Sequence, residues 1–438
     1  MGSKVNANPT KEFFISMLTR DIDIRAAILE LIDNSIDGAK RMRPHGDYSG
    51  LYIRLSYNKD EFRIIDNCGG ISIKTATEYA FRFGRSSSRK QEHIPGQSFT
   101  GIFGIGMKRS LFRLGEKFDI KSSTDADHFR LLVDVKEWIK DDGYDWSFQF
   151  SEEGKKEDFP DEEIGTNILV TNLHDGISQQ FTLPSFSNSL IEYIERFRTL
   201  AVENGLEISI NGTPIMFSTE KILKTDKIIP YSKSETIDSV TIKVIAGIAP
   251  KGLPKNAGWY VYCNGRLVVF ADQTSLTVWG EDGVRNYHPS LAFFRGFVFF
   301  ESQELGELPW NTTKTNVDSS SKYYIYAKTM MREATIQVLS ESQPIIDGDI
   351  PEDVEKTIFT SNSFALSTTN IASITQNQSD FSLEFAGIKV IEPMTSISFK
   401  KPTKLVKIMK KSMNVSTNKD VGTKAFDYYF KRECDDDE

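Results

Sequence analysis

The stretch ELIDNSIDGA, residues 30–39, lies within the clearest helical pattern of this 438-residue chain. Apolar residues recur at helical spacing from residue 22 to residue 42. Glu30, Asn34 and Asp37 stand at i, i+4 and i+7, so a helix would project all three from one side, beside its apolar stripe. The stretch predicts a core helix with one polar corner facing a cavity, although the triplet alone also fits a solvated helix face.

A predicted strand pair follows this helix. Alternating apolar and polar residues fill segments 51–57 and 61–66, and a three-residue turn joins them. The second segment runs into DNCGG, residues 66–70, which places a carboxylate at a strand end and glycines where the backbone must pass close to another group. A buried Asp66 could accept a hydrogen bond from an exocyclic amine, while an ordinary turn uses the same residue types.

Two further segments carry candidate binding residues. GIFGIGMKRS, residues 101–110, runs a glycine loop into a helix, where free backbone N–H groups, the helix dipole and Lys108 suit phosphate. A glycine loop alone is equally typical of a flexible segment. GTNILV, residues 165–170, enters a late strand with a Thr166 hydroxyl that could lie beside Asp66. The sequence has no Gly-x4-Gly-Lys-Ser/Thr P-loop, so any phosphate must be held by another device.

In this order and spacing, the four segments resemble the gyrase, chaperone, histidine kinase and mismatch-repair (GHKL) family of ATPases. The resemblance covers about residues 10–175. It implies an α+β fold that begins with a Bergerat-type domain, a sandwich of helices on a mixed β-sheet. It also implies ATP and Mg²⁺ as cofactors.

The same resemblance implies a role for each candidate residue. Glu30 would be the general base on the attacking water, Asn34 would hold Mg²⁺, and Asp37 would support the site. Asp66 would receive the adenine amine with Thr166 nearby. The glycine at position 70 would let the base lie against the backbone, and a mobile lid over the phosphates would include Gly101, Gly104, Gly106, Met107 and Lys108.

A second α+β domain is predicted behind the first, and it resembles the transducer domain of several GHKL proteins. In such proteins one transducer loop returns a lysine to the terminal phosphate. LPWNTTKTNVD, residues 308–318, lies in a corresponding place, which makes Lys314 the candidate. An exposed loop lysine is the alternative. Asn264-Gly265-Arg266 resembles a strand turn of transducers, and a plain hairpin turn explains it equally well.

The expected organisation has four parts. These are an ATP-binding domain (1–176), a transducer-like domain (177–345), a Ser/Thr/Asn-rich linker (346–398) and a basic run with a short C-terminal helix (399–438). This layout is similar to Microrchidia-like ATPases, although the zinc finger and long coiled coil of many such proteins are missing from the sequence.

Composition limits the setting of the protein. A net charge of −8 gives no overall attraction to nucleic acid or anionic membrane. Three widely spaced cysteines fit a reducing compartment, so a cytoplasmic location is expected. Since no apolar run reaches the length of a membrane span, no membrane partner is expected either.

Three functions fit these features. The preferred one is an ATPase that acts as a conformational switch, in which nucleotide controls closure of a homodimer and engagement of DNA or another partner. The second is a nucleotide-gated binding module with negligible turnover. The third, a histidine-type kinase, would need a phosphoacceptor histidine before the ATP domain, and none of the five histidines stands there. Six lysines within 399–411 fit contact with DNA phosphates or a solvated tail equally well.

Overall fold

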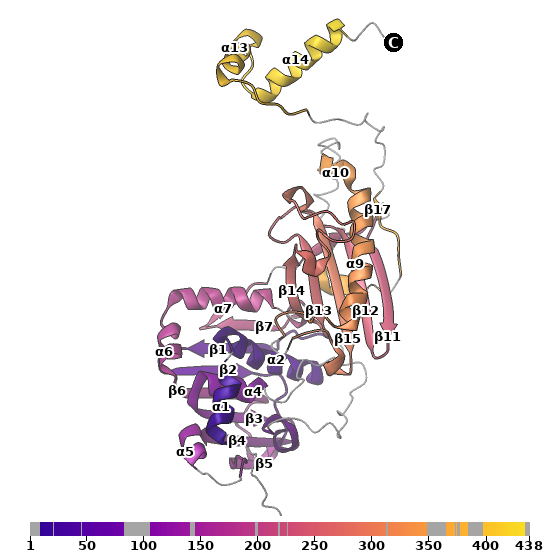
Figure 1. Cartoon of the computed structure of the whole chain (residues 1–438). Helices are drawn as coiled ribbons and strands as arrows, with labels where there is room; N and C mark the ends of the chain where they lie inside the picture. Colours follow the sequence, from indigo (N-terminus) through magenta and orange to yellow (C-terminus); the bar gives the residue numbers. More distant parts are fainter. Residues whose placement is uncertain are drawn as a thin grey trace, which may run out of the picture. The chain divides into compact units, whose positions relative to one another are not determined.

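The computed structural model describes residues 9–20, 22–44, 46–82, 106–140, 145–197, 200–217, 220–225, 227–311, 314–347, 365–372, 374, 377–383 and 397–433. The chain divides into two compact units, Met1–Ala386 and Gly387–Glu438. The first unit contains two large sheets with their helices, and the second contains a pair of helices (Figure 1). The predicted α+β class is confirmed.

The first large sheet is mixed and has the strand order β5-β4-β3-β6-β2-β1-β7-β8. All neighbouring strands are antiparallel except β1 and β7, which are parallel. Alternate residues of β1 are buried, so one face of the sheet packs on helices. The strands are β1 (Tyr52–Tyr57), β2 (Glu61–Asp66), β3 (Gly115–Ser123), β4 (Asp127–Asp134), β5 (Phe150–Lys155), β6 (Gly165–Leu173), β7 (Glu207–Ile210) and β8 (Thr213–Pro214).

Helix α2 is the central helix of this first domain and lies where the sequence predicts it. Asp23 caps its N-terminus by accepting a hydrogen bond from the backbone N–H of Arg25 at 2.9 Å. Its apolar stripe is buried in the core that it shares with α4 and the sheet. The described helices of this domain are α1 (Lys11–Thr19), α2 (Ile24–Met42), α3 (Ile73–Thr75), the π-helix η1 (Ala76–Ala80), α4 (Gly106–Leu114), α5 (Val135–Lys140), the short helix η2 (Lys156–Asp158), α6 (Asp175–Phe181), α7 (Pro184–Arg196) and α8 (Leu200–Glu203).

The second large sheet has the order β11-β12-β15-β13-β14, with β13 and β15 parallel and the other neighbours antiparallel. Every residue of β13 is buried because both faces of the sheet are covered. Helix α9 (Lys322–Glu341) packs on one face, and its buried residues join the core of this domain. The strands are β11 (Tyr231–Ile237), β12 (Val240–Ile248), β13 (Gly258–Cys263), β14 (Arg266–Asp272) and β15 (Phe294–Ser302).

The opposite face of the second sheet is covered by residues after position 364. Ile371 of α12 (Thr368–Ala372) is fully buried there, and Lys243 donates a hydrogen bond to the carbonyl oxygen of Ala372 at 2.6 Å. Two short strand pairs hold the returning chain in place. They are β9 (Lys221–Leu223) with β16 (Ala365–Ser367), and β10 (Ile228–Ile229) with β17 (Ser382–Leu383).

Two expected domain boundaries therefore differ from the structure. The first domain does not end at residue 176, because β7 pairs with β1 and residues as far as Ile215 belong to the first core. The expected linker 346–398 contributes α12, β16 and β17 to the second domain. The segment was predicted as a linker because most of its residues are polar. A few apolar side chains, such as Ile371 and Phe381, are nevertheless buried in the second domain.

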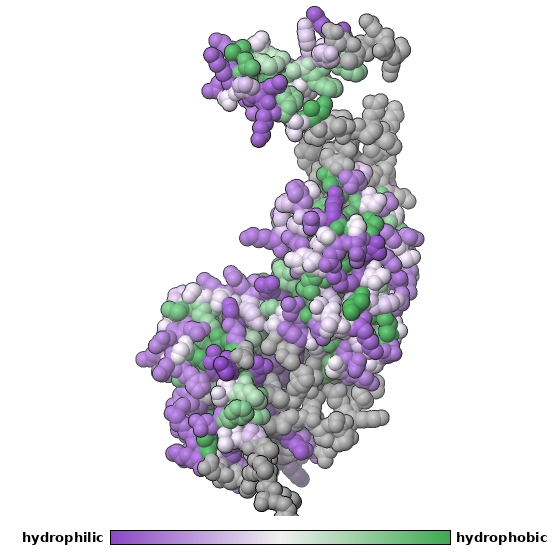
Figure 2. Space-filling model, viewed as in Figure 1, coloured by the Kyte–Doolittle hydropathy of each residue, from purple (hydrophilic) through white to green (hydrophobic). Residues whose placement is uncertain are grey.

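The C-terminal unit consists of α13 (Thr403–Met413) and α14 (Asn418–Glu433). Residues 397–433 hold ten Lys and Arg against three Asp and Glu, a net charge of +7, whereas the chain as a whole carries −8. Apolar side chains such as Leu405, Ile408 and Phe426 are more than half exposed, and Figure 2 shows apolar and hydrophilic side chains close together on this unit. None of the described helices is long and apolar enough to cross a membrane.

Candidate functional site

Helix α2 places the three predicted residues on the side that the sequence indicates. The Glu30 side chain is only 13 % exposed, and Asp37 is buried. The Asn34 side chain stands one turn after Glu30, and its buried Nδ2 atom has no hydrogen-bond partner among the described residues. The burial of Glu30 and Asp37 excludes the alternative of a solvated helix face.

The turn after β2 holds Asp66 as a buried hydrogen-bond acceptor. Its carboxylate accepts from the Ser35 hydroxyl at 2.6 Å and from the backbone N–H of Cys68 at 2.9 Å. Burial raises the pKa of Asp66, and these two hydrogen bonds act in the opposite direction. Sequence reasoning missed Ser35, because a serine among the apolar residues of a helix gives no sign that it orients a carboxylate of another segment.

Thr166 lies directly across from Asp66 in the register of β2 and β6. Its hydroxyl is 3.2 Å from the hydroxyl of Ser122, which in turn accepts a hydrogen bond from the backbone N–H of Ile71 at 2.7 Å. Ser122 thus connects the predicted threonine to the glycine turn. Sequence reasoning missed it because a serine near a strand end carries no pattern of its own.

The predicted glycine at position 70 is required by the fold itself. Gly70 has φ +70°, and a Cβ added there would overlap the carbonyl oxygen of Ser123. This close approach holds the DNCGG turn against the end of β3. Whether the same glycine also lies against a nucleotide base stays a prediction.

The start of α4 lies beside Glu30. A Cβ on Gly106 would overlap Oε2 of Glu30, so a side chain at this position would displace the carboxylate from the helix start. Met107 is buried in the core, and the Lys108 ammonium donates hydrogen bonds to the carbonyl oxygens of Ala80 and Arg82. The Lys108 ammonium group is thus engaged with backbone carbonyl oxygens, and its contact with phosphate stays a prediction. The other two glycines of the expected lid, Gly101 and Gly104, fall outside the described residues.

Lys314 reaches the same carboxylate from the second domain. Its Nζ atom lies 2.9 Å from Oε1 of Glu30, and the Lys314 side chain is only 4 % exposed. The residue has φ +54°, a left-handed conformation that is uncommon outside glycine and concentrates at functional sites. Asn311 supports it by accepting the backbone N–H of Lys314 at 2.9 Å through its carbonyl oxygen, and the N–H of Thr315 at 2.9 Å through its side chain. Lys314 is therefore a buried lysine, not an exposed loop lysine.

These contacts bring residues that are far apart in sequence into one place. A carboxylate stands between an ammonium group and the beginning of a helix, both of which attract negative charge. One turn further along α2 is an amide with an unused donor, and Ser35 links the helix to the buried carboxylate of Asp66. Such a site can hold an anionic group at one end and an amine at the other.

Residues 22–166 match the family model described as "Histidine kinase-, DNA gyrase B-, and HSP90-like ATPase". This match identifies that region as a GHKL-type ATPase domain, as the four sequence segments predict. It includes Glu30, Asn34, Asp66 and Thr166 and ends before the domain that carries Lys314. No curated protein matches the chain.

Proposed function

We propose that this protein is a Mg²⁺-dependent ATPase whose nucleotide state controls closure of a homodimer and engagement of DNA or another partner. The contact between Glu30 and Lys314 carries the proposal. It joins a base candidate in the ATPase domain to a cation from a separate domain, at 2.9 Å and with both side chains largely buried. A residue pair of this kind can sense a terminal phosphate and transmit its loss to the second domain.

The chemistry assigned to Glu30 is activation of water. Its carboxylate accepts a proton from the water as the water oxygen bonds to the terminal phosphorus, and the bond to the bridging oxygen of ADP breaks. Lys314 stabilises the negative charge that develops on the phosphoryl oxygens. Asn34 would hold Mg²⁺, which would supply further positive charge to the phosphate oxygens. A reducing, cytoplasmic setting is part of this proposal.

The adenine end of the site is assigned to Asp66. Replacing Asp66 with Asn should weaken ATP binding by about 10- to 100-fold, since a hydrogen bond to a charged group contributes about 1.5–3 kcal/mol. Unfolding temperature without nucleotide should not fall, because Asn still accepts from the N–H of Cys68 and removes a buried charge. Titration calorimetry and thermal unfolding measure the two effects. The exposed Asp145→Asn is the control, and an unchanged ATP affinity in Asp66→Asn would exclude the assignment.

Dimer closure rests on the resemblance and on an exposed apolar pair, Phe13 and Met17, one turn apart on α1. A non-hydrolysable ATP analogue should raise the mass in solution from 49.6 kDa to twice that value. Light scattering with and without the analogue measures it. A mass that stays at 49.6 kDa at saturating analogue would contradict nucleotide-dependent closure.

Partner engagement is supported by residues 397–433 of the C-terminal unit, whose net charge of +7 precedes the acidic residues 435–438 and favours an anionic partner. From the sequence alone, the lysine run fits contact with DNA phosphates and a solvated tail equally well. Addition of double-stranded DNA to the ATPase assay distinguishes them: stimulation of turnover supports a DNA-linked switch. Two other functions were considered from the sequence. A nucleotide-gated module would bind ATP without turnover, and a histidine-type kinase would transfer phosphate to protein.

A further inference from the structure

The charged side of α2 contacts the second domain through two residues besides Glu30. Residues 30, 33 and 40 lie along one side of the helix at spacings of three and seven. Each touches a different residue of the second domain. The three contacts are Glu30 with Lys314, Asp33 with Arg266, and Lys40 with the carbonyl oxygen of Asn264 at 3.2 Å.

Asp33 and Arg266 form the most deeply buried of these contacts. Their side chains are 2 % and 1 % exposed, and the guanidinium touches the carboxylate directly. Burial lowers the pKa of Arg266 to about 10, while the charge of Glu30 acts in the opposite direction. Arg266 therefore keeps its positive charge at neutral pH. Removing one partner of such a pair leaves an uncompensated charge in the interface.

The hairpin turn that carries Arg266 is held rigidly. Asn264 and Gly265 both have positive φ, +48° and +78°, the conformation of a tight two-residue turn between β13 and β14. The side chain of Asn264 donates to the carbonyl oxygen of Ser302 at 2.9 Å and accepts from the N–H of Ser302 at 3.0 Å. The turn is thus fixed to the last residue of β15.

The same strand end begins the segment that carries Lys314. The hydroxyl of Ser302 accepts the N–H of Glu304 at 3.0 Å, and the chain then passes through the short helix η5 (Leu305–Glu307). A bridge between Trp310 and Val317 closes the loop around Lys314. Arg266 and Lys314 therefore share one support, the end of β15, and both reach α2 from it.

We propose that Asp33 and Arg266 are positioning residues that fix the register between α2 and the loop of Lys314. With this register held, the Lys314 ammonium meets the Glu30 carboxylate and any phosphate beside it. When this register is lost, the loop of Lys314 keeps its own fold, but its ammonium group is no longer aligned with the Glu30 carboxylate. The proposal rests on the proposed ATPase function, yet it concerns a geometry that can be measured without turnover.

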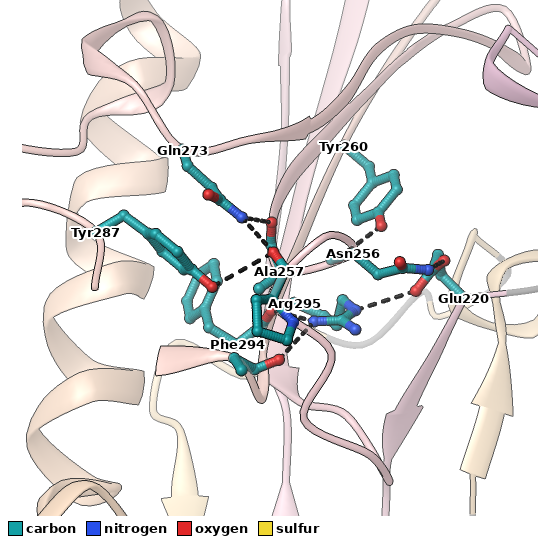
Figure 3. Close-up of polar contacts among 10 residues, drawn as sticks. Glu220, Asn256, Ala257, Tyr260, Gln273, Tyr287, Phe294 and Arg295 are labelled. Carbon is teal, nitrogen blue, oxygen red and sulfur yellow. Dashed lines mark hydrogen bonds and ion pairs between the residues drawn. The ribbon is translucent and has the colours of Figure 1, made fainter. Parts of the chain in front are cut away.

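The test compares Arg266→Met with a control from the same domain, Arg295→Met. Arg295 forms a buried ion pair within the second domain, with Glu220 at 3.0 Å, and also donates to the carbonyl oxygen of Phe294 (Figure 3). It stands seven residues from Ser302 along β15, roughly 23 Å at about 3.3 Å per residue. Both variants break a buried pair, so their losses of stability should be comparable, whereas only Arg266→Met breaks the contact with α2.

Arg266→Met should lower kcat by about 10²-fold, the effect of a displacement of about 1 Å at a reacting centre, with little change in KM for ATP. Arg266→Lys, which restores the charge, should recover part of kcat. Amide exchange at Lys314 and Thr315 should become faster in Arg266→Met and not in Arg295→Met. The expected result is thus a kcat effect and a local exchange effect confined to the Arg266 variant.

Two results would overturn the positioning role. One is unchanged kcat and unchanged amide exchange around Lys314 in Arg266→Met. The other is an equal loss of kcat in Arg295→Met at equal unfolding temperature, which would indicate a general loss of stability. Failure of the ATPase function itself would be seen differently, as no ATP binding or turnover by the unmodified chain, and the exchange measurement would still decide the positioning role.

Discussion

Replacement of Glu30 by Gln should lower the rate of ATP hydrolysis by about 10²–10⁴-fold, the usual contribution of a general base. Gln has nearly the same shape as Glu and can still accept the hydrogen bond from Lys314, which lies 2.9 Å from the carboxylate. It cannot take a proton from water. ATP affinity should therefore stay within a few-fold of the unmodified protein, which separates loss of catalysis from loss of binding.

Phosphate release at saturating ATP and direct binding of ATP give the two quantities. Glu137→Gln, at an exposed position of α5, is the matched control and should leave both unchanged. If Glu30→Gln hydrolysed ATP at the unmodified rate, Glu30 could not be the base, and the carboxylate would serve only to hold Lys314.

The second large effect is expected from Lys314→Met, which should lower kcat by about 10²–10³-fold, as removal of one fixed charge-stabilising donor does. The side chain is almost fully buried against Glu30, so its ammonium needs little rearrangement to reach a phosphate held beside that carboxylate. Met keeps the length of the buried chain and removes the charge. Steady-state kinetics with ATP measure the change.

Lys322→Met is the control for this variant, because Lys322 pairs with Asp238 at 2.7 Å on the exposed surface of the same domain. It should leave kcat unchanged. A rise in kcat for Lys314→Met would contradict the assignment, since it would mean that the ammonium restrains Glu30 instead of stabilising the phosphoryl group.

Much of the ATPase domain was predictable because its signals are local. The helical spacing of residues 30–39 places Glu30 and Asn34 on one side of α2, and the strand before DNCGG places Asp66 at its end. Helix propensity, strand alternation and turn glycines each act over a few residues, so a sequence pattern records them directly.

The less predictable features depend on contacts between distant segments. Ser35 and Ser122 support Asp66 and Thr166 through hydroxyl contacts that have no sequence pattern. Polar residues around Ile371 resemble a linker, yet that side chain is fully buried against the second sheet. In each case tertiary packing decides the outcome, and local composition does not record it.

The C-terminal helices show the same limit in another way. The predicted small helix is present as α14, and residues 403–411 of the basic run lie in α13, whereas Lys400 and Lys401 precede that helix. The four aromatic residues of α14 between positions 426 and 430 are at least half exposed. The sequence does not show that α14 contacts α13. The aromatic residues of α14 therefore could not be counted as neighbours of the lysines when nucleic-acid binding was predicted.

The most direct test of the proposed ATPase activity is the release of inorganic phosphate from ATP by the full chain, with Mg²⁺ present and with Mg²⁺ removed by a chelator. We expect slow release that requires Mg²⁺ and that is lost in both Glu30→Gln and Lys314→Met. ATP binding without release under any condition, including added DNA, would contradict hydrolysis as the function and would favour a nucleotide-gated binding module.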